Sequence, residues 1–180
     1  SRSAAPRRGR EALALPTDGE RGRVMRVRLI VVGRDRNDPI VDAADAYLER
    51  VRRTLPAETV ELKEVPLRKS TSAERVMAAE AERIEAALGP RDRVIALDRS
   101  GARLDSEALA RRLDTARAGG VDAWSILIGG PSGLHASLLE RAHERWSLSA
   151  MTFPHRVARL VISEQLYRAC AILRGEPYHK

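Results

Sequence analysis

Two small, nearly uncharged stretches late in the chain hold the residues with the clearest potential to bind a ligand. The first is GGPSG at 129–133, and the second is SLSAMT at 147–152, one short helical pattern later. Glycines let the backbone approach a ligand closely, and the second stretch presents backbone N–H and C=O groups beside apolar side chains. Such surfaces favour a flat, neutral ring such as adenine over a triphosphate. The pattern therefore indicates an adenosine cofactor without phosphates, with S-adenosylmethionine as the obvious candidate.

Other site chemistries fit these residues poorly. The segment GGPSGLHAS lacks the lysine of a phosphate-binding P-loop and does not follow the G-x-G-x-x-G dinucleotide pattern. It is not a G-x-S-x-G nucleophile motif either. His135 and His143 belong to no HExxH or CxxC pattern, so we expect surface histidines and no metal site. The plainer alternative for 129–133 is a tight turn between a strand and a helix.

The elements that must position these stretches follow from hydrophobic periodicity. Strand patterns alternate with helix patterns five times: strands at 25–33, 58–66, 93–98, 123–130 and 146–153, and helices at 40–55, 71–89, 105–120, 134–145 and 156–175. The second helix opens with Thr71-x-x-Glu74, a capping-box pattern. Such alternation predicts an α/β fold with a mostly parallel sheet and helices on both faces. Ligands bind at the carboxyl ends of parallel strands, where both stretches and LDRSG at 97–101 are expected.

Composition limits the class of protein. The 180 residues carry a formal net charge of +7, and residues 1–24 supply six arginines against three acidic residues. We interpret 1–24 as a disordered or vector-derived extension and 25–180 as a single domain. The basic charge suits a polyanionic partner without requiring one. Cys170 falls in an apolar helical pattern and is expected to be a core thiol. No apolar run approaches the roughly 20 residues of a membrane helix, so we expect a cytoplasmic protein.

Several motifs, in a fixed order, give the chain a resemblance to a known family. They are VVG at 31–33, ALD at 96–98, LIGGPSGL at 127–134, WSLSAMTFPH at 146–155, SEQLYRA at 163–169 and PYH at 177–179. Together they resemble the RlmH-type ribosomal RNA large-subunit methyltransferases of the SPOUT class, over residues 25–180. The resemblance implies a knotted SPOUT (α/β-knot) fold with a C-terminal trefoil knot, and a homodimer. It also implies methylation of N3 of a pseudouridine in large-subunit (23S) ribosomal RNA, on the assembled ribosome.

The resemblance further implies a site for S-adenosylmethionine, with S-adenosylhomocysteine as product, and no metal. The residues carried over are Leu97, Gly129, the adjoining Gly130, and Leu148, Ser149, Ala150, Met151, Thr152 and Phe153. The two small-residue stretches would then be the walls of one pocket. A larger side chain at Gly129 or Ser149 is expected to fill that pocket without unfolding the protein. Arg68 and Lys69 match a basic loop of the family, and Glu176 departs from its tail, where histidine more often precedes Pro-Tyr-His.

Methyl transfer to an imide nitrogen requires that the nitrogen lie in line with the S–CH3 bond and lose its proton. A nearby cation favours the imide anion, so Arg168 is the catalytic candidate. The alternative is a solvated helix arginine, which Glu164, one turn away, could simply pair with. Tyr178 and His179 are candidates to stack on a base and relay a proton, against the alternative of a floppy tail. We expect them to complete the partner subunit's active site. For His155, contact with the RNA substrate and a structural hydrogen bond are equally compatible with the sequence.

Two rival functions stay open on the sequence. One is another SPOUT-type methyltransferase that acts on transfer RNA or protein. The other is a non-enzymatic, ribosome-associated RNA-binding protein, which would bind no cofactor. For the homodimer, the apolar positions of the last helix exceed what one face needs to cover its own sheet. These positions are Val157, Leu160, Val161 and Leu166.

Overall fold

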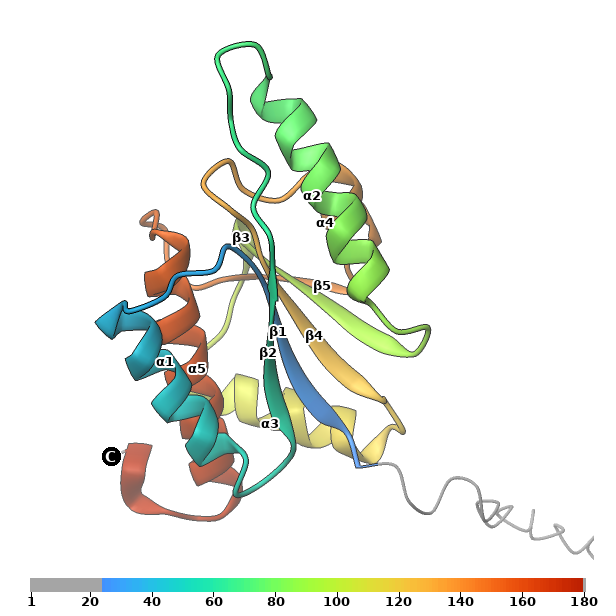
Figure 1. Cartoon of the computed structure of the whole chain (residues 1–180). Coiled ribbons are helices and arrows are strands. Elements are labelled where there is room, and N and C mark those ends of the chain that lie inside the picture. Colours follow the sequence, from blue (N-terminus) through green and yellow to red (C-terminus); the bar gives the residue numbers. More distant parts are fainter. Residues whose placement is uncertain (1–23, 180) are drawn as a thin grey trace, which may run out of the picture.

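The computed structural model describes residues 24–179, within which five strands and five α-helices alternate (Figure 1). The strands are β1 (Arg26–Val32), β2 (Ala57–Leu62), β3 (Asp92–Arg103), β4 (Ala123–Ile128) and β5 (Glu144–Ser147). The helices are α1 (Pro39–Val51), α2 (Ala73–Ala87), α3 (Ser106–Ala118), α4 (Ala136–Arg141) and α5 (His155–Leu173), followed by one 3₁₀ turn, Pro177–His179. Apart from Val24, the predicted extension at 1–24 lies outside the described residues. None of the helices described is both long enough and apolar enough to cross a membrane.

The five strands form one sheet in the order β2-β1-β4-β3-β5, and every neighbouring pair is parallel. This confirms the predicted α/β architecture. The central strand, β4, has the uninterrupted sequence AWSILI and is buried at every position. A strand that is covered on both faces has no wet side, so a continuous run replaces the alternation of half-exposed strands.

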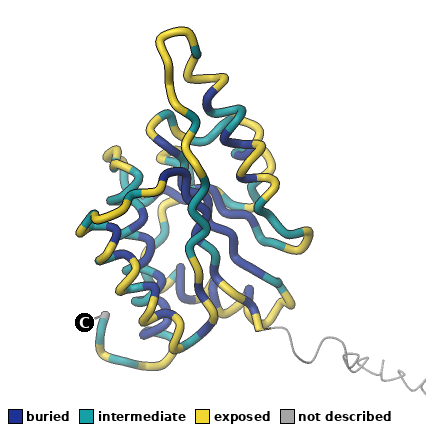
Figure 2. The backbone as a smooth tube through the Cα atoms, viewed as in Figure 1, coloured by how far each residue is buried: buried dark blue, intermediate teal, exposed yellow. Residues whose placement is uncertain are grey.

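Helices cover both faces of the sheet. α1, α3 and α5 pack on one face and α2 and α4 on the other, with the buried residues concentrated between these layers (Figure 2). The larger core, under α1, α3 and α5, includes Trp124 and Trp146 in edge-to-face contact, 5.1 Å between ring centroids. Cys170 is fully buried there, which confirms the predicted core thiol, and burial raises its pKa. Leu166 is fully buried as well, so its expected contribution to a dimer surface is wrong.

Side chains that accept hydrogen bonds from free N–H groups fix where the helices begin. Asp105 caps α3, where its side chain accepts from the Ala108 N–H. At α2 the predicted capping box is wrong by one residue, because Ser72 and not Thr71 adopts the extended cap conformation and accepts from the first turn. Glu74 instead bonds Nε2 of His135 at 2.9 Å, which ties α2 to the start of α4.

Strand β3 is longer than predicted. The stretch LDRSG at 97–101, expected as a loop, instead continues the strand, which runs to Arg103 and bulges after Leu97 where it pairs with β5. A Cβ on Gly101 would lie 2.6 Å from the backbone of Arg145. Glycine is therefore required where these two strands approach each other so closely.

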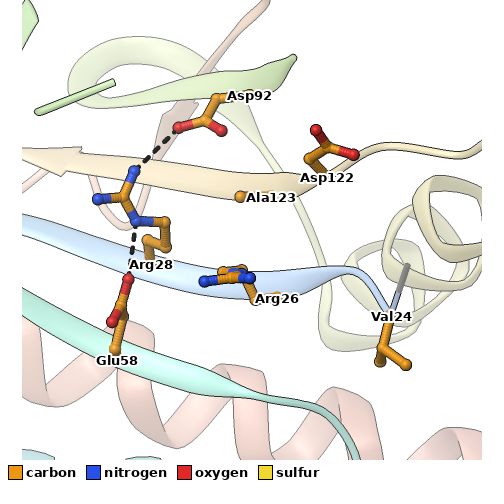
Figure 3. A pocket seen from close by; sticks show the side chains of 7 residues that line it. All are labelled: Val24, Arg26, Arg28, Glu58, Asp92, Asp122 and Ala123. Atoms are coloured by element: carbon orange, nitrogen blue, oxygen red, sulfur yellow. Dashed lines mark hydrogen bonds and ion pairs between the residues drawn. The ribbon is translucent and has the colours of Figure 1, made fainter. Parts of the chain in front are cut away.

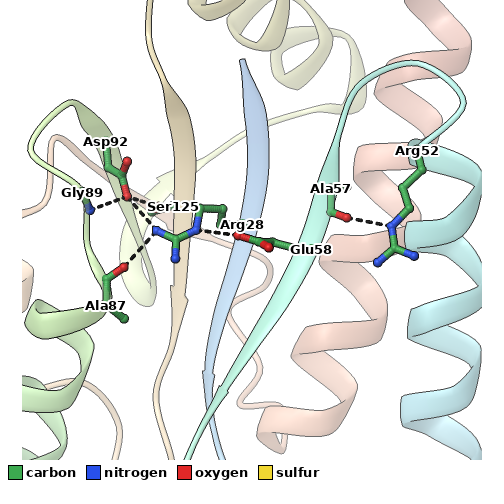
Figure 4. A network of polar contacts seen from close by, with 8 residues as sticks. All are labelled: Arg28, Arg52, Ala57, Glu58, Ala87, Gly89, Asp92 and Ser125. Carbon is green, nitrogen blue, oxygen red and sulfur yellow. Dashed lines mark hydrogen bonds and ion pairs between the residues drawn. The ribbon is translucent and has the colours of Figure 1, made fainter. Parts of the chain in front are cut away.

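A hollow of about 290 Å³ lies at the amino ends of the strands (Figure 3). Arg28 of β1 forms part of its wall and bonds Glu58 at 2.9 Å and Asp92 at 3.1 Å. Asp92 also accepts from the Ser125 hydroxyl and from the Gly89 N–H (Figure 4). These charges hold four strands and a loop together. Ligand sites of parallel sheets lie at the opposite edge, so we interpret this hollow as structural.

Candidate functional site

A cleft of about 880 Å³ opens at the carboxyl ends of β4 and β5, beside the bulge in β3. Its lining comes from three segments, at 97–99, 128–134 and 146–158. Parallel strands end at one edge of the sheet, so chain segments separated by a helix become neighbours there. The volume is within the range of roughly 300–1,000 Å³ that is typical of small-molecule sites.

Most of the predicted cofactor residues line this cleft. They are Leu97, Gly129, Gly130, Leu148, Ser149, Met151, Thr152 and Phe153. Ala150 is exposed in the same loop but is not part of the lining. The structure thus brings the GGPSG and SLSAMT stretches to one cleft, and their role in holding a cofactor stays a prediction.

The glycine wall of the cleft, defined as residues 129–133, closes on itself. The Gly133 N–H donates to the Gly130 carbonyl at 2.9 Å, and Gly133 has a φ of +86°, a conformation that favours glycine. A Cβ on Gly129 would lie 2.6 Å from the carbonyl carbon of Gly133. The expectation that a side chain at 129 simply fills the pocket is therefore wrong, because it would first strike the backbone of its own loop.

The second wall is shaped by two serine hydroxyls. Ser147 Oγ donates to the Ser149 carbonyl at 2.9 Å, and Ser149 Oγ accepts from the Met151 N–H at 3.0 Å. Both hydroxyls therefore hold the loop in shape. Leu148 and Phe153 add apolar surface to the lining.

The end of this second wall is anchored to the segment that follows β1. His155 Nε2 bonds Asp35 Oδ2 at 2.9 Å, and Arg156 pairs with Asp38. The bond from Arg156, together with the Ile40 N–H, holds the pKa of Asp38 below its usual value. The structural bond considered for His155 is thus present. Because His155 also lines the cleft, its contact with substrate stays a prediction.

Arg168, Glu164 and Tyr178 form a second cluster, where the tail folds back against α5. Arg168 bonds Glu164 at 2.5 Å, its guanidinium carbon lies 4.9 Å from the centroid of the Tyr178 ring, and the Tyr178 hydroxyl bonds Glu164 at 3.2 Å. The bond to Glu164 raises the pKa of Arg168. Burial, with bonds to Tyr47 and Glu164, raises the pKa of Tyr178. Arg168 is therefore paired with Glu164. Tyr178 packs against Arg168, so the alternative of a floppy tail does not hold for this residue.

Within one chain, this cluster and the cleft lie at opposite ends of α5. His155 and Arg168 are 13 residues apart on the helix, which is about 20 Å at a rise of about 1.5 Å per residue. The structure therefore does not bring the predicted catalytic residues to the predicted cofactor site of the same chain. Arg68 and Lys69 are exposed in the basic loop, defined as residues 63–72, which projects beyond α2 at the top of Figure 1.

His135 and His143, which the sequence does not indicate as metal ligands, form local structural hydrogen bonds. His143 Nδ1 accepts from the Val94 N–H at 3.0 Å, beside the start of β5, and His135 caps the short helix α4. Across residues 24–179, no three His, Cys, Asp or Glu side chains are grouped as a metal site requires.

One polar residue behind the cleft belongs to none of the sequence motifs. Glu80 of α2 is only 3% exposed and accepts from the Val65 N–H at 3.2 Å. Burial raises the pKa of its carboxyl. A signal is nonetheless present in the sequence, since Glu80 lies at helical spacing between the buried Val76 and Ile84.

Comparison with known proteins agrees with the motif resemblance. A profile of the family described as "Predicted SPOUT methyltransferase" matches residues 25–179. The protein named ribosomal RNA large subunit methyltransferase H in Anaeromyxobacter sp. (strain Fw109-5) is 48% identical over 156 residues, covering 87% of this chain and 100% of the relative. Its namesake in Gemmatimonas aurantiaca is 44% identical with the same coverage.

Solved structures support the fold alone. A probable methyltransferase from Bordetella pertussis Tohama I superimposes with a TM-score of 0.52 at 18% identity, covering 82% of this chain and 97% of that one. A probable methylase family protein from Haemophilus influenzae Rd KW20 gives a TM-score of 0.51 at 17% identity, covering 87% of this chain and 70% of that one. With a family profile that spans nearly all described residues and relatives close to half identical along their whole length, the chain belongs to the SPOUT methyltransferase family.

Proposed function

We propose that the chain is an S-adenosylmethionine-dependent methyltransferase of large-subunit ribosomal RNA. The observation that carries this proposal is the identity of 44% to 48% to relatives named ribosomal RNA large subunit methyltransferase H, along their entire length. The cleft supports this proposal, because both of the stretches that the resemblance assigns to the cofactor line it.

The lining of the cleft fits an adenosine cofactor. Backbone groups of both walls lie beside the apolar side chains of Leu97, Leu134 and Phe153, which suits a flat, uncharged ring. The lining contains no lysine, and one of its arginines, Arg156, is already paired with Asp38. A polyphosphate needs several free cations or N–H groups around it, so an uncharged nucleoside group is the better match.

The motif resemblance also supports a specific target nucleotide and a specific assembly. The proposed target is N3 of a pseudouridine in 23S ribosomal RNA on the assembled ribosome, and the proposed enzyme is a homodimer whose last strand and α5 form a trefoil knot. Val157, Leu160 and Val161 are half-buried on α5 and offer apolar surface for a dimer contact. The exposed Arg68 and Lys69 offer positive charge to the RNA backbone.

The chemistry asks little of the protein beyond orientation and removal of a proton. The cofactor, when bound, supplies an electrophilic methyl group. Holding the acceptor nitrogen in line with that group contributes roughly 7–11 kcal/mol in favourable cases. Arg168 is proposed to favour the imide anion, His179 to carry the N3 proton away, and Tyr178 to stack on the base.

These catalytic roles require a second subunit. Because Arg168 lies about 15 Å along α5 from Ala158, the last residue of that helix to line the cleft, we assign Arg168 and the Tyr178 that contacts it to the cleft of the partner subunit. Arg168 and the tail would act there as one unit, since they contact each other across 4.9 Å.

Methylation of ribosomes from a strain that lacks the gene tests the proposal. The purified protein with S-adenosylmethionine should add one methyl group to a pseudouridine of 23S ribosomal RNA, detected by mass spectrometry of nuclease fragments. Calorimetry with S-adenosylmethionine and S-adenosylhomocysteine distinguishes this function from the two alternative functions. A non-enzymatic RNA-binding protein would bind neither compound, whereas an enzyme for transfer RNA or protein would bind both and leave the 23S RNA unmodified.

A further inference from the structure

Glu80 lies behind the cleft, between two segments that the proposed reaction uses. Its Oε1 accepts from the Val65 N–H at 3.2 Å, near the start of the basic loop. Its Oε2 faces the glycine wall, because a Cβ built on Gly130 would lie 3.2 Å from it. One buried carboxylate is therefore packed against both a wall of the cleft and the root of the basic loop.

The stability of the fold does not account for a carboxylate at this position. Glu80 is 3% exposed on the core-facing side of α2, and it forms no ion pair with any residue the structure describes. Desolvation disfavours its charged form, and the Val65 N–H opposes this only in part. A leucine or methionine would suit the space between Val76 and Ile84 better. The carboxylate thus points to a role other than stability.

We propose that Glu80 is a positioning residue that links the glycine wall to the basic loop, so that cofactor and RNA each bind more tightly when the other is bound. This inference rests on the proposed function. A cofactor in the cleft fixes the glycine wall, which fixes Glu80 and, through the bond to Val65, the root of the loop. A loop that is already ordered loses less conformational freedom on meeting RNA. By linkage, the same coupling strengthens cofactor binding in the RNA complex.

Hydrogen exchange at the Val65 amide of the full chain tests the link. S-adenosylmethionine at saturation should slow this exchange several-fold in the wild type and leave it unchanged in Glu80→Ala. Glu82→Ala, an exposed position on the same helix, is the matched control and should behave as the wild type. If the cofactor binds and Val65 exchanges at the same rate with and without it, the inference is wrong. If no cofactor binds at all, the proposed function fails instead.

A second test changes the glycine wall, which faces the Glu80 carboxylate, and leaves Glu80 itself in place. Gly130→Ala places a methyl group 3.2 Å from Glu80 Oε2 and 3.4 Å from Val32 Cγ1, so it displaces Glu80 without changing it. Gly130→Ala and Glu80→Ala should each raise the KM for ribosomes about 5- to 10-fold, and the double variant should be no worse than the more impaired single variant. Glu80→Gln keeps an acceptor for Val65 and should stay within about 2-fold.

Two results of this second test would overturn the link. One is a double variant whose loss equals the product of the single losses, because independent effects multiply. The other is a loss in Glu80→Gln as large as that in Glu80→Ala. Circular dichroism confirms folding of each variant, and if Glu80→Ala does not fold, Gly130→Ala carries both measurements.

Discussion

At Gly129, the space that a side chain would need is already occupied by the backbone of Gly133 and Leu134. A substitution there acts on the shape of the loop before it acts on a ligand. Gly120 is a useful contrast, since its φ is +70° but no atom lies within 4 Å of the position that a Cβ would take. The two glycines therefore separate steric overlap from conformational strain.

Gly129→Ala should lower the free energy of unfolding by about 1–3 kcal/mol, because the new methyl group overpacks the loop. It should also weaken S-adenosylmethionine binding more than about 10-fold, which is a loss of roughly 1.4 kcal/mol. Gly120→Ala should lose about 1–2 kcal/mol through strain alone and bind the cofactor normally. Urea unfolding and calorimetry check both variants, and normal cofactor binding by Gly129→Ala would refute the assignment of the glycine wall.

The raised pKa of Glu80 predicts how the stability of the fold depends on pH. Its pKa is raised in the folded state by burial, so the folded protein takes up a proton at a higher pH than the unfolded chain does. Wild-type stability therefore falls as pH rises from the ordinary carboxyl pKa of 4.5 through the folded pKa, while Glu80→Gln has no such group. Glu80→Gln should be more stable than the wild type at pH 7, and the difference should vanish below about pH 4.5. Denaturant melts across this range measure it, and a difference that is constant from about pH 4 to 7 would contradict the prediction.

At the scale of elements, α5 is held by a buried arginine. The Arg159 side chain is 5% exposed and bonds Asp45 of α1 at 2.8 Å and Glu61 of β2 at 3.0 Å. It therefore joins the helix that carries the second cluster to α1 on the same face of the sheet and to β2 at the sheet edge. Asp45 is exposed and Glu61 is half-buried, so the bonds are weaker than those of a fully buried ion pair.

Arg159→Ala should lower the free energy of unfolding by about 2–3 kcal/mol, because charge-assisted bonds and packing are both lost. Arg141→Ala, in an exposed pair with Glu85 at 3.8 Å, is the control and should change it by less than about 0.5 kcal/mol. Denaturant melts of both variants measure the difference. Equal effects would show that Arg159 does not clamp α5.

Elements with a strong local pattern were predictable from the sequence. In α1 and the turn that follows it, the apolar residues at helical spacing are all buried: Val41, Ala44, Leu48, Val51 and Leu55. The unbroken run of β4 indicates a central strand. The cap at Ser72 and the length of β3 were not predictable. Thr71 and Ser72 are adjacent and both can cap a helix, and pairing with β5 carries β3 past its hydrophobic run.

The candidate site was predictable only in part. The two walls of the cleft follow from strand order and small-residue loops, so Gly129 and Ser149 were placed together correctly. The separation of Arg168 from the cleft depends on the direction of α5 across the sheet, which no spacing along the chain reveals. The helical spacing of Glu80 from Val76 and Ile84 indicates that it is buried, but a lone carboxylate on an apolar helix face matches no motif that would indicate its role.

At the scale of the whole molecule, the apolar surface of α5 predicts a homodimer. Val157, Leu160 and Val161 remain half-buried in the single chain. Light scattering at micromolar concentration should give the mass of two chains. Leu160→Glu should shift the protein to the monomer while the fold is kept, because a charge is costly in an apolar interface. A wild-type monomer would argue against the assembly.

Mixing two inactive variants tests the composite active site. Deletion of 177–180 removes the tail, and Ser149→Trp blocks the cleft. If tail and cleft come from different subunits, their heterodimer holds one intact site and should recover roughly half of one dimer's activity. Tail deletion mixed with Arg168→Ala should recover none, because Arg168 and Tyr178 belong to one cluster. The tail deletion alone should bind S-adenosylmethionine within a few-fold of the wild type.

The outcome of that mixing experiment is clear in either direction. A site built within one subunit would leave no intact site in any heterodimer. Absence of recovered activity, with heterodimers shown to form, would therefore place the tail outside the partner's cleft.

The position of α5 at the end of the fold has a consequence for protein synthesis. Ile162, Leu166, Ala169 and Cys170 of this helix complete the larger core, and they are translated after every strand of the sheet. A nascent chain that has reached only residue 154 therefore leaves one apolar face of the sheet without its central helix, a state prone to aggregate or to be held by chaperones. Contacts between α5 and α1 join segments that lie far apart in the sequence, so they form late. By this order of events, the larger core closes only when synthesis of the chain is nearly finished.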